Sequence, residues 1–291
     1  MAPSFSTPYV DALQTFYDNV GKSYNNMTSK VHAGGPERII AAAGPSIAPG
    51  SSVLDLATGT GKVALLAAQK VGPSGHVLGI DISSKFIEIA YQMAADQGVA
   101  SQVEFLHRDV MNLDLPGEKY AGRWADAVTC GSAIAMFPEP KAMLEVLARD
   151  VLKPGGVLVA DGWGPLLPAK AFLDVAVPRG YVPSVDPRWL SEADGMFERI
   201  FEGSRFELVR VEREGESETR FDVGTEEKIE ALWKSMSVDQ TWLNFGLEKL
   251  DEGTVGEIKK AWIEELKKYK NEEGNVVSQI GQWIAVAVLK E

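Results

Sequence analysis

A glycine-rich turn between an apolar run and a helix-like run is the strongest chemical signal in this sequence. Residues 53–62 read VLDLATGTGK, with an acid at Asp55 and glycines at Gly59 and Gly61. The glycines permit a tight turn and let a ligand approach the backbone closely, and the N-terminus of the following helix offers N–H groups to a carboxylate or phosphate. The segment therefore predicts a site for an anionic or nucleotide-like ligand.

A phosphate-binding P-loop is excluded by two positions of this segment. That motif needs the pattern G-x-x-x-x-G-K-S/T. Here the position of the first glycine is occupied by Leu56, and Lys62 is followed by Val63. The turn is therefore not a cradle for a nucleoside triphosphate.

A dinucleotide-binding loop fits the same segment locally. The pattern G-x-G-x-x-G/A matches Gly59, Gly61 and Ala64, and Asp81 follows Gly61 by 20 residues, at the end of the next strand-like run. An acid at that place can accept both hydroxyls of a ribose. A nicotinamide-dependent oxidoreductase therefore stays open, although it leaves a further acid, Asp109, without a role.

The elements that must position these residues alternate between short β-rich runs and helix-compatible stretches. Such alternation is typical of a parallel, doubly wound α/β sheet. Ser83 precedes a helix with an apolar face, so we expect it to cap that helix. The expected strands span residues 52–57, 76–82, 103–106, 125–130 and 157–160, and the expected helices span 61–71, the stretch after Ser83, and 139–151.

The flanking segments are expected to form one domain, 1–291, with this core. Residues 1–50 read as an N-terminal helical cap, and residues 51–162 as the binding core. In the C-terminal half, residues 163–291, helical stretches at about 225–270 lie between two strand-like runs. An insertion of that kind predicts a lid on one domain, because it interrupts a single sheet.

Four further elements are expected in the flanking segments. The N-terminal stretch from about 9 to 30 is aromatic and helical, and a helix is expected at 191–202. Apolar runs at 206–213 and 283–289, the latter reading WIAVAVL, predict the last two strands.

Taken together, the ordered motifs resemble those of the class I S-adenosylmethionine (SAM)-dependent methyltransferases, in particular the UbiE/COQ5-like group that acts on small molecules. The resemblance covers residues 17 to 162 and rests on several motifs in order. They are Tyr17-Asp-Asn-Val-Gly-Lys-Ser-Tyr24, Asp55-Leu-Ala-Thr-Gly-Thr-Gly61, Asp81 in GIDIS, Asp109 in VEFLHRDV, Asp126-Ala-Val-Thr-Cys-Gly-Ser132, and VLKPGGVLVADG.

The resemblance implies a Rossmann-like, doubly wound sheet of seven strands. The sheet is expected to be mostly parallel with an antiparallel last strand, and to carry N-terminal helices and a helical lid insertion. The family implies SAM as cofactor, S-adenosylhomocysteine (SAH) as product, and no metal ion. Two departures from the family pattern are Ala57, where the turn usually has its first glycine, and Asn25, where the aromatic motif usually ends in Asp.

The resemblance also implies a role for each cofactor residue. Asp81 would accept the ribose hydroxyls and Asp109 the adenine amino group, while Asp55 would orient the turn or receive the ammonium of the methionine part. Cys130 is expected to be a small core residue rather than a nucleophile. The implied cofactor residues are Tyr17, Tyr24, Asp55, Ala57, Thr58, Gly59, Gly61, Asp81, Ile82, Asp109, Val110, Cys130 and Gly131.

Methyl transfer of this kind is an in-line displacement, and a general base is needed only where the acceptor must lose a proton. His32, which follows the aromatic motif, is the candidate, and a satisfied structural histidine is its alternative. His107 and His76 are weaker candidates. The spacing of the three histidines matches no metal-binding motif.

The acceptor is expected to be small and apolar or aromatic, in the manner of a polyketide or quinone, and to be methylated on O or C. Met136, Trp163 and Trp233 are the substrate-binding candidates, and packing within the lid is the alternative for each. Phe137, Met236, Trp189 and Trp242 are further candidates. A second hypothesis is a SAM-binding pericyclase or cyclase of natural-product biosynthesis that transfers no methyl group.

Composition restricts the partners. With 29 Lys and Arg against 41 Asp and Glu, the net charge of −12 argues against nucleic acid, which needs clustered basic residues. The single cysteine excludes an internal disulfide, and the sequence shows neither a basic leader nor an apolar stretch of about 20 residues. We therefore expect a cytoplasmic enzyme of secondary metabolism with no membrane insertion. The oligomeric state is open.

Overall fold

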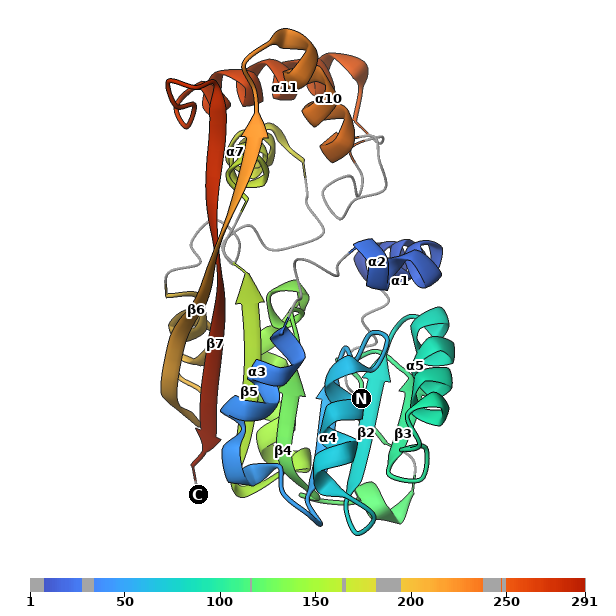
Figure 1. The fold of residues 1–291 in the computed structure, drawn as a ribbon. Coiled ribbons are helices and arrows are strands. Elements are labelled where there is room, and N and C mark those ends of the chain that lie inside the picture. The colour runs from blue at the N-terminus through green and yellow to red at the C-terminus, as the bar shows by residue number, and fades with distance from the viewer. Residues whose placement is uncertain are drawn as a thin grey trace.

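A seven-stranded sheet forms the body of the protein in the computed structural model, which describes residues 8–27, 34–115, 117–163, 166–181, 195–237, 247 and 250–290 (Figure 1). The strand order is β3-β2-β1-β4-β5-β7-β6, with β1 to β5 parallel and β7 antiparallel to both of its neighbours. This confirms the predicted Rossmann-like sheet with an antiparallel last strand. The strands are β1 (Ser52–Leu56), β2 (His76–Asp81), β3 (Val103–His107), β4 (Ala125–Cys130), β5 (Leu152–Trp163), β6 (Phe206–Asp222) and β7 (Asn275–Leu289).

Helices cover both faces of this sheet and extend beyond its upper end (Figure 1). Within the described ranges, none is both long enough and apolar enough to cross a lipid bilayer. The helices are α1 (Pro8–Val20), α2 (Tyr24–Met27), α3 (Gly35–Ala42), α4 (Lys62–Val71), α5 (Ser84–Asp96), α6 (Pro140–Val146), α7 (Leu167–Ala176), α9 (Met196–Phe201), α10 (Glu226–Ser237) and α11 (Glu252–Lys267).

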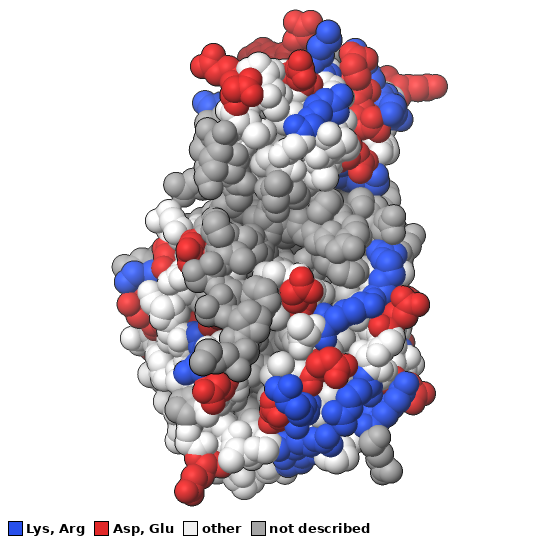
Figure 2. Space-filling view, turned by 180° about the vertical axis from the view of Figure 1, so that it is seen from behind, with Lys and Arg blue, Asp and Glu red and all other residues white. Residues whose placement is uncertain are grey.

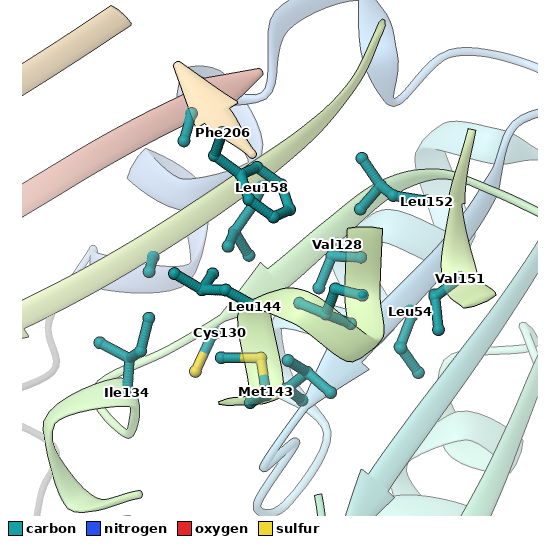
Figure 3. Close-up of a cluster of buried hydrophobic side chains, with 14 of the residues drawn as sticks. Leu54, Val128, Cys130, Ile134, Met143, Leu144, Val151, Leu152, Leu158 and Phe206 are labelled. Atoms are coloured by element: carbon teal, nitrogen blue, oxygen red, sulfur yellow. The ribbon is translucent and has the colours of Figure 1, made fainter. Parts of the chain in front are cut away.

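The central strands are apolar on both faces because each face is covered. Side chains alternate along a strand, so Val53 packs with α3, α4 and α5 on one face of β1, and Leu54 packs with α6 and α9 on the other. Figure 3 shows the second cluster, in which Leu54, Val128 and Leu158 of the sheet meet Leu144 of α6. The predicted short apolar runs are therefore the buried centre of the molecule.

Ser83 caps α5 as predicted. Its Oγ accepts a hydrogen bond from the backbone N of Phe86 at 3.2 Å. The same hydroxyl donates to Oδ1 of Asp18, in α1, at 2.6 Å. The cap residue therefore also holds the N-terminal helix over α5.

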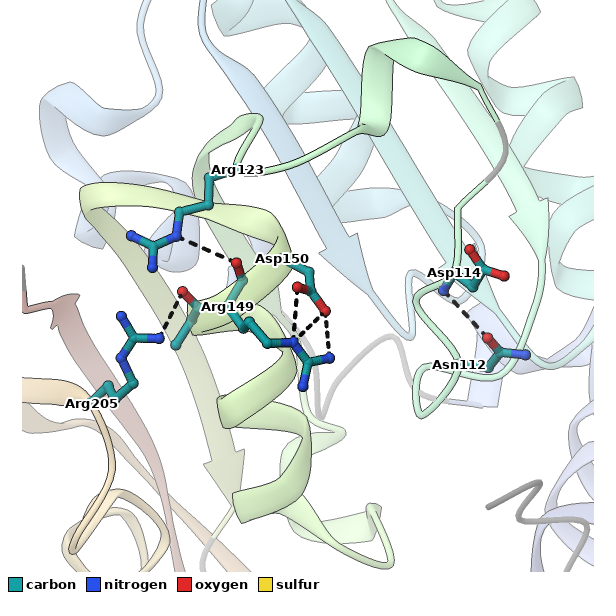
Figure 4. A network of polar contacts seen from close by, with 7 residues as sticks. Asn112, Asp114, Arg123, Arg149, Asp150 and Arg205 are labelled. Atoms are coloured by element: carbon teal, nitrogen blue, oxygen red, sulfur yellow. Dashed lines mark hydrogen bonds and ion pairs between the residues drawn. The ribbon is translucent and has the colours of Figure 1, made fainter. Parts of the chain in front are cut away.

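The helix predicted over 139–151 changes pitch part of the way along. After α6, residues Leu147–Val151 form a π-helical turn that leads into β5. The side chains of Arg123 and Arg205 donate to carbonyl groups of this turn (Figure 4). These donors satisfy carbonyls that the end of a helix leaves without a partner.

The last two strands are longer than the predicted runs at 206–213 and 283–289. Beyond the end of β5 they continue as a two-stranded ribbon, and α7, α10 and α11 pack around its tip as an upper lobe (Figure 1). The sequence missed this extension because the continuation of β6 is a charged run, EREGESETR, without apolar alternation. Of the helix predicted at 191–202, residues 191–194 lie outside the described part of the chain, and α9 covers 196–201.

The upper lobe has a hydrophobic core of its own. The rings of Trp233 and Trp262 pack against each other at 5.3 Å between centroids, with their planes tilted by 53°, and Phe172 packs against Trp233. The indole Nε1 of Trp262 donates to the carbonyl of Pro168 at 3.0 Å, so this buried polar atom is satisfied. The lobe therefore buries its own cluster of apolar side chains.

Two glycines give opposite predictions for stability. A Cβ on Gly79 in β2 would lie 2.7 Å from the Phe105 ring and 2.9 Å from Oγ1 of Thr58, whereas a Cβ on Gly256, in α11, would meet nothing within 4 Å. We expect Gly79→Ala to lower the free energy of unfolding by about 1–3 kcal/mol through overpacking. Gly256→Ala should raise it by about 0.5–1 kcal/mol, since alanine favours a helix. Denaturant unfolding measures both, and a Gly79→Ala midpoint equal to that of the wild type would contradict the packing described.

Candidate functional site

Two adjoining hollows lie at the carboxyl ends of the parallel strands, where open α/β sheets bind their ligands. The first hollow, of about 690 Å³ including space open to solvent, lies between the ends of β2 and β4 and the helices α1 and α2. The second hollow, of about 560 Å³, lies between the glycine turn, α3, the carboxyl end of β5 and the middle of β7. The two share lining residues and therefore form one site. The shared residues are Tyr24, Ala57, Gly59, Gly131 and Ser132.

Most of the predicted cofactor residues line these hollows. The first hollow also contains the predicted acceptor residue Met136. Predicted residues on the first hollow are Tyr17, Tyr24, Ala57, Gly59, Asp81, Ile82, Asp109, Val110 and Gly131, and those that the second hollow adds are Asp55 and Thr58.

The glycine turn depends on left-handed backbone conformations. Gly59 and Gly61 have φ values of +56° and +87°. A Cβ on Gly59 would meet nothing within 4 Å, so the missing side chain leaves room for a ligand, whereas one on Gly61 would lie 3.0 Å from Cβ of Ala90. Ala57 has φ +49°, which costs an alanine roughly 1–2 kcal/mol. The turn thus stores strain at the position where the family usually has glycine.

Asp55 holds this turn in place. Its Oδ2 accepts from Oγ1 of Thr58, in the turn, and its Oδ1 accepts from Oγ1 of Thr129, in β4, both at 2.6 Å. Burial raises its pKa to about 6, against the opposing effect of these hydroxyl donors. The contacts match the first of the two roles expected for Asp55, orientation of the turn.

Asp81 ends β2 beside the open face of the turn. Its two oxygens accept from the backbone N of Gly59 at 2.8 Å and of Ser83 at 2.9 Å. Burial raises its pKa to about 6, although both hydrogen bonds oppose the shift. Each oxygen keeps a second lone pair, so the carboxylate can accept two neighbouring hydroxyls of a ribose.

Asp109 lies further along the first hollow, past the end of β3. Its Oδ1 accepts from the backbone N of Met111 at 2.9 Å, and partial burial raises its pKa. Ile82 and Val110 add apolar surface on this part of the hollow. A carboxylate flanked by two apolar residues suits a flat base that carries an amino group.

Aromatic side chains from α1 and α2 line one side of the first hollow. The rings of Tyr17 and Tyr24 lie 5.5 and 4.8 Å from the ring of Phe86, in α5. The hydroxyl of Tyr17 donates to Sδ of Met136 at 3.6 Å. Burial, then the charges of Asp81 and Asp161, raise the pKa of Tyr24 to about 12, so its phenol stays protonated.

Asn25, the departure from the family motif, links α2 to the glycine turn. Its Oδ1 accepts from Oγ1 of Thr60 at 2.8 Å. Thr60 also lines the second hollow. An amide serves this contact without adding another negative charge near Asp81.

Some predicted residues lie away from the hollows. The Cys130 side chain is buried in the core cluster of Figure 3, as expected of a small core residue, so a cofactor contact at this position concerns its main chain. Trp233 and Met236 pack in the core of the upper lobe, which matches the packing alternative. Gly61 is the N-cap residue of α4, directly before the helix begins at Lys62.

The histidines within the described residues have structural partners. His107 Nε2 lies 2.8 Å from the carbonyl oxygen of Ile82. His76 Nε2 lies 2.8 Å from the hydroxyl of Tyr120, at the amino end of β2 and hence at the end of the sheet opposite the hollows. The base candidate His32, the side chain of Trp163, and Trp189 and Trp242 lie outside the described residues, so those predictions stand untested.

Sequence reasoning missed a polar cluster between the carboxyl end of β5 and the middle of β7. Asp161 accepts from the backbone N of Ser132 and from Nε2 of Gln282, and Oε1 of Gln282 accepts from Nε of Arg38 at 2.7 Å. Burial raises the pKa of Asp161 to about 6. The only local signal in the sequence was an acid at the end of the apolar run VLVAD. Its partner Gln282 lies 121 residues further along the chain, so no local pattern contains both residues.

The charge of the site is negative. Asp55, Asp81 and Asp161 are almost completely buried around the two hollows. Among the residues that the structure describes, no group of three or more His, Cys, Asp or Glu side chains is arranged to hold a metal ion. The site therefore suits an organic ligand with positive charge and ribose-like hydroxyls, a description that SAM fits.

Comparison with known proteins agrees with this geometry. Residues 47–171 match a family described as a methyltransferase domain. The chain is 29% identical over 178 residues to the 2-phytyl-1,4-naphtoquinone methyltransferase of Synechococcus elongatus, covering 60% of this chain and 74% of that protein. It is 30% identical over 162 residues to the demethylmenaquinone methyltransferase of Symbiobacterium thermophilum, covering 54% of this chain and 62% of that protein.

Solved structures share the fold. A protein of Bacillus halodurans described as a putative methyltransferase superposes with a TM-score of 0.55 at 22% identity, covering 88% of this chain and 99% of that one. The cyclase SpnF superposes with a TM-score of 0.51 at 18% identity, covering 88% and 81%. The order of the strands, the aspartates around the glycine turn and the match to a methyltransferase domain together support an enzyme that is a SAM-dependent methyltransferase with the class I fold, similar to the UbiE-like group.

Proposed function

We propose that this enzyme transfers the methyl group of SAM to an O or C atom of a small, apolar or aromatic, quinone-like acceptor. One observation carries the proposal. The same continuous site contains carboxylates that suit a nucleoside and, beside them, a set of apolar side chains that suits a flat acceptor. Leu13, Met136, Phe137 and Pro138 provide that flank in the first hollow. Two relatives named for quinone substrates support the acceptor class.

The proposed cofactor contacts follow from the hollows. Asp81 accepts the ribose hydroxyls, Asp109 accepts from the adenine amino group, and Ile82 and Val110 hold the faces of the base. Gly59 would leave room for the cofactor beside the turn, because a Cβ there would meet nothing within 4 Å. When bound, the cofactor supplies an electrophilic methyl group on a sulfonium sulfur.

The work of the protein is then alignment and exclusion of water. A nucleophile held about 3 Å from the methyl carbon in line with the bond that breaks gains most of its rate from positioning. Positive charge disappears during the transfer, so a hollow closed to water favours it. We propose that Tyr17 and Tyr24 close the site from above and that His32, where the acceptor is a phenol or enol, takes its proton.

We propose that the whole chain works as one domain, with 1–50 as cap, 51–162 as cofactor core, and 163–291 carrying a lid at about 225–270. The pairing of β7 with β5 supports this. Along the chain, α10 and α11 come between β6 and β7, which are strands of the same sheet. Trp163, at the end of β5, is the proposed contact between this half and the acceptor.

We also propose a cytoplasmic enzyme of secondary metabolism that binds no nucleic acid. The single, buried cysteine fits a reducing compartment. On the face shown in Figure 2, acidic side chains adjoin the basic ones over the body, which does not suit a polyanion.

Calorimetric titration tests the cofactor site first. Wild-type protein should bind SAM and SAH, and Asp81→Ala should weaken both by about 100-fold, because hydrogen bonds from the ribose to a charged group are lost. Asp174→Ala, on the exposed side of α7, is the matched control and should bind as the wild type does. Failure of the folded wild type to bind either ligand would refute the cofactor assignment.

Product analysis tests methyl transfer itself. Incubation with SAM and a panel of hydroquinones, naphthols and polyketide-like phenols should give a product heavier than the acceptor by one methylene unit, together with SAH. The reason is that the apolar flank of the first hollow accepts a flat ring beside the cofactor. A product of unchanged mass would favour the cyclase hypothesis, for which the likeness to SpnF shows only the fold.

Binding of SAM should depend on pH. Burial raises the pKa of Asp55, Asp81 and Asp161 to about 6, with His107 and Arg38 as the basic groups that act on Asp81 and Asp161. A cation binds the ionised carboxylates, so affinity should fall as pH drops through about 6, by roughly tenfold between pH 7.5 and 5 for each carboxylate that binding restores to its ordinary pKa. Calorimetry at the two pH values measures the affinity for SAM. Equal affinities would contradict the prediction that the ionised carboxylates interact with the cofactor.

A further inference from the structure

Ser132 has a backbone conformation that a serine rarely adopts. Its φ is +57°, in the left-handed region, and among the described residues other than glycine only Ala57 shares a positive φ. A left-handed conformation costs free energy in any residue with a side chain, so it persists where the surrounding structure enforces it. A contact that holds Ser132 is therefore expected close to it.

This residue lies where the two hollows adjoin. Ser132 follows the end of β4 by two residues and lines both hollows. The chain then forms a short 3-10 turn, Ile134–Met136, and Ala133, Met136 and Phe137 line the first hollow. The direction in which the chain leaves β4 thus decides where this wall of the first hollow lies.

Asp161 makes the contact that holds Ser132. Its Oδ1 accepts from the backbone N–H of Ser132, and the hydroxyl of Ser132 lies 3.4 Å from the same oxygen. Its Oδ2 accepts from the side-chain amide of Gln282. The carboxylate is 1% exposed, and both of its oxygens serve donors of the protein itself. Hydrogen bonds to a charged acceptor are the stronger ones, so this contact can offset the cost of the left-handed serine.

Gln282 and Arg38 hold Asp161 in its orientation. Arg38 donates through Nε and Nη2 to Oε1 of Gln282, so the amide presents its NH₂ group to Asp161. Burial raises the pKa of Asp161 to about 6, which leaves the side chain ionised at neutral pH and able to accept on both oxygens. The contacts therefore run from α3 through β7 to β5 and end on the backbone of Ser132.

The neighbouring strand has a matching arrangement. β1 and β4 pair side by side, and each is followed by one left-handed residue that is not glycine. Ala57 follows β1, in the turn whose Thr58 donates to Asp55. A buried carboxylate thus fixes the backbone after each strand, Asp55 after β1 and Asp161 after β4.

We propose that Asp161 is a positioning residue for cofactor binding, which holds Ser132 in the left-handed conformation that shapes the junction of the two hollows. Gln282 and Arg38 act through Asp161. The inference rests on the cofactor site described above, and it gives the carboxylate of Asp161 no ligand of its own. Without this contact Ser132 relaxes, and the affinity for SAH falls with the fraction of molecules in which the site is formed.

A binding cycle between the two positions tests the inference. SAH is titrated into wild type, Asp161→Ala, Ser132→Gly and the double variant. Asp161→Ala should weaken binding about 5- to 30-fold, the factor that corresponds to the cost of a left-handed residue with a side chain. In the presence of Ser132→Gly, the same change should weaken binding at most about threefold, because glycine adopts a positive φ about as readily as a negative one.

Ala57→Gly is the matched control, because it relieves the other left-handed residue. In its presence Asp161→Ala should keep its full effect on the affinity for SAH. Equal losses from Asp161→Ala with and without Ser132→Gly would overturn the inference, since the carboxylate would then act by a route other than Ser132. A wild type that binds no SAH would refute the cofactor assignment instead.

The backbone gives a readout that needs no ligand. In a crystal structure of Asp161→Ala, residue 132 should leave the left-handed region, and a φ that stays near +57° would overturn the inference. If Asp161→Ala does not fold, Asp161→Leu takes its place in both experiments with the same expected results. Leucine fills the space of the carboxylate with an apolar side chain and accepts no hydrogen bond from Ser132.

Discussion

The site depends most on the carboxylate of Asp55, held between two threonine hydroxyls. Thr58 belongs to the glycine turn and Thr129 to β4, so this one side chain joins the turn to the neighbouring strand. Without that link, a turn that carries a left-handed alanine would relax toward an ordinary conformation. The space beside Gly59, the placement of Asp81 and the boundary between the two hollows all follow from the turn's position.

Burial of negative charge around the turn lowers the stability of the folded protein, and a positively charged ligand offsets this loss. The pKa values of Asp55, Asp81 and Asp161 are raised to about 6, so the folded protein without cofactor binds protons more readily than the unfolded chain. Their contribution to stability is therefore present below about pH 4 and lost as pH rises through about 6. At neutral pH the folded protein bears this penalty, and a cationic cofactor would relieve it. A fold with no ligand to bind would gain by replacing these acids.

The sequence predicts those parts of the fold and site that are coded locally. The central strands, the cap at Ser83 and the acids that end β1 and β2 follow from short apolar runs, turn residues and family motifs. The ribbon and the cluster around Asp161 do not, because their partners are set by tertiary pairing. Gln282 meets Asp161 only when β7 lies against β5, and no pattern within either strand encodes that register. Trp233 shows a second limit of the sequence, since an aromatic residue in a lid predicts a substrate contact as readily as packing in the lobe, and here it packs in the lobe core.

The register of β7 also connects the site with the upper lobe. The last pair that β5 makes with β7 is Trp163 with Gln282, and beyond it the residues that the structure describes add no third strand to the ribbon. β6 has an irregularity between Glu214 and Glu216, opposite this same point. A ribbon bends most easily where a bulge interrupts its ladder and a neighbouring strand ends. Gln282 therefore lies where the lobe leaves the sheet, and the amide that orients Asp161 cannot keep its place unless the ribbon keeps its direction.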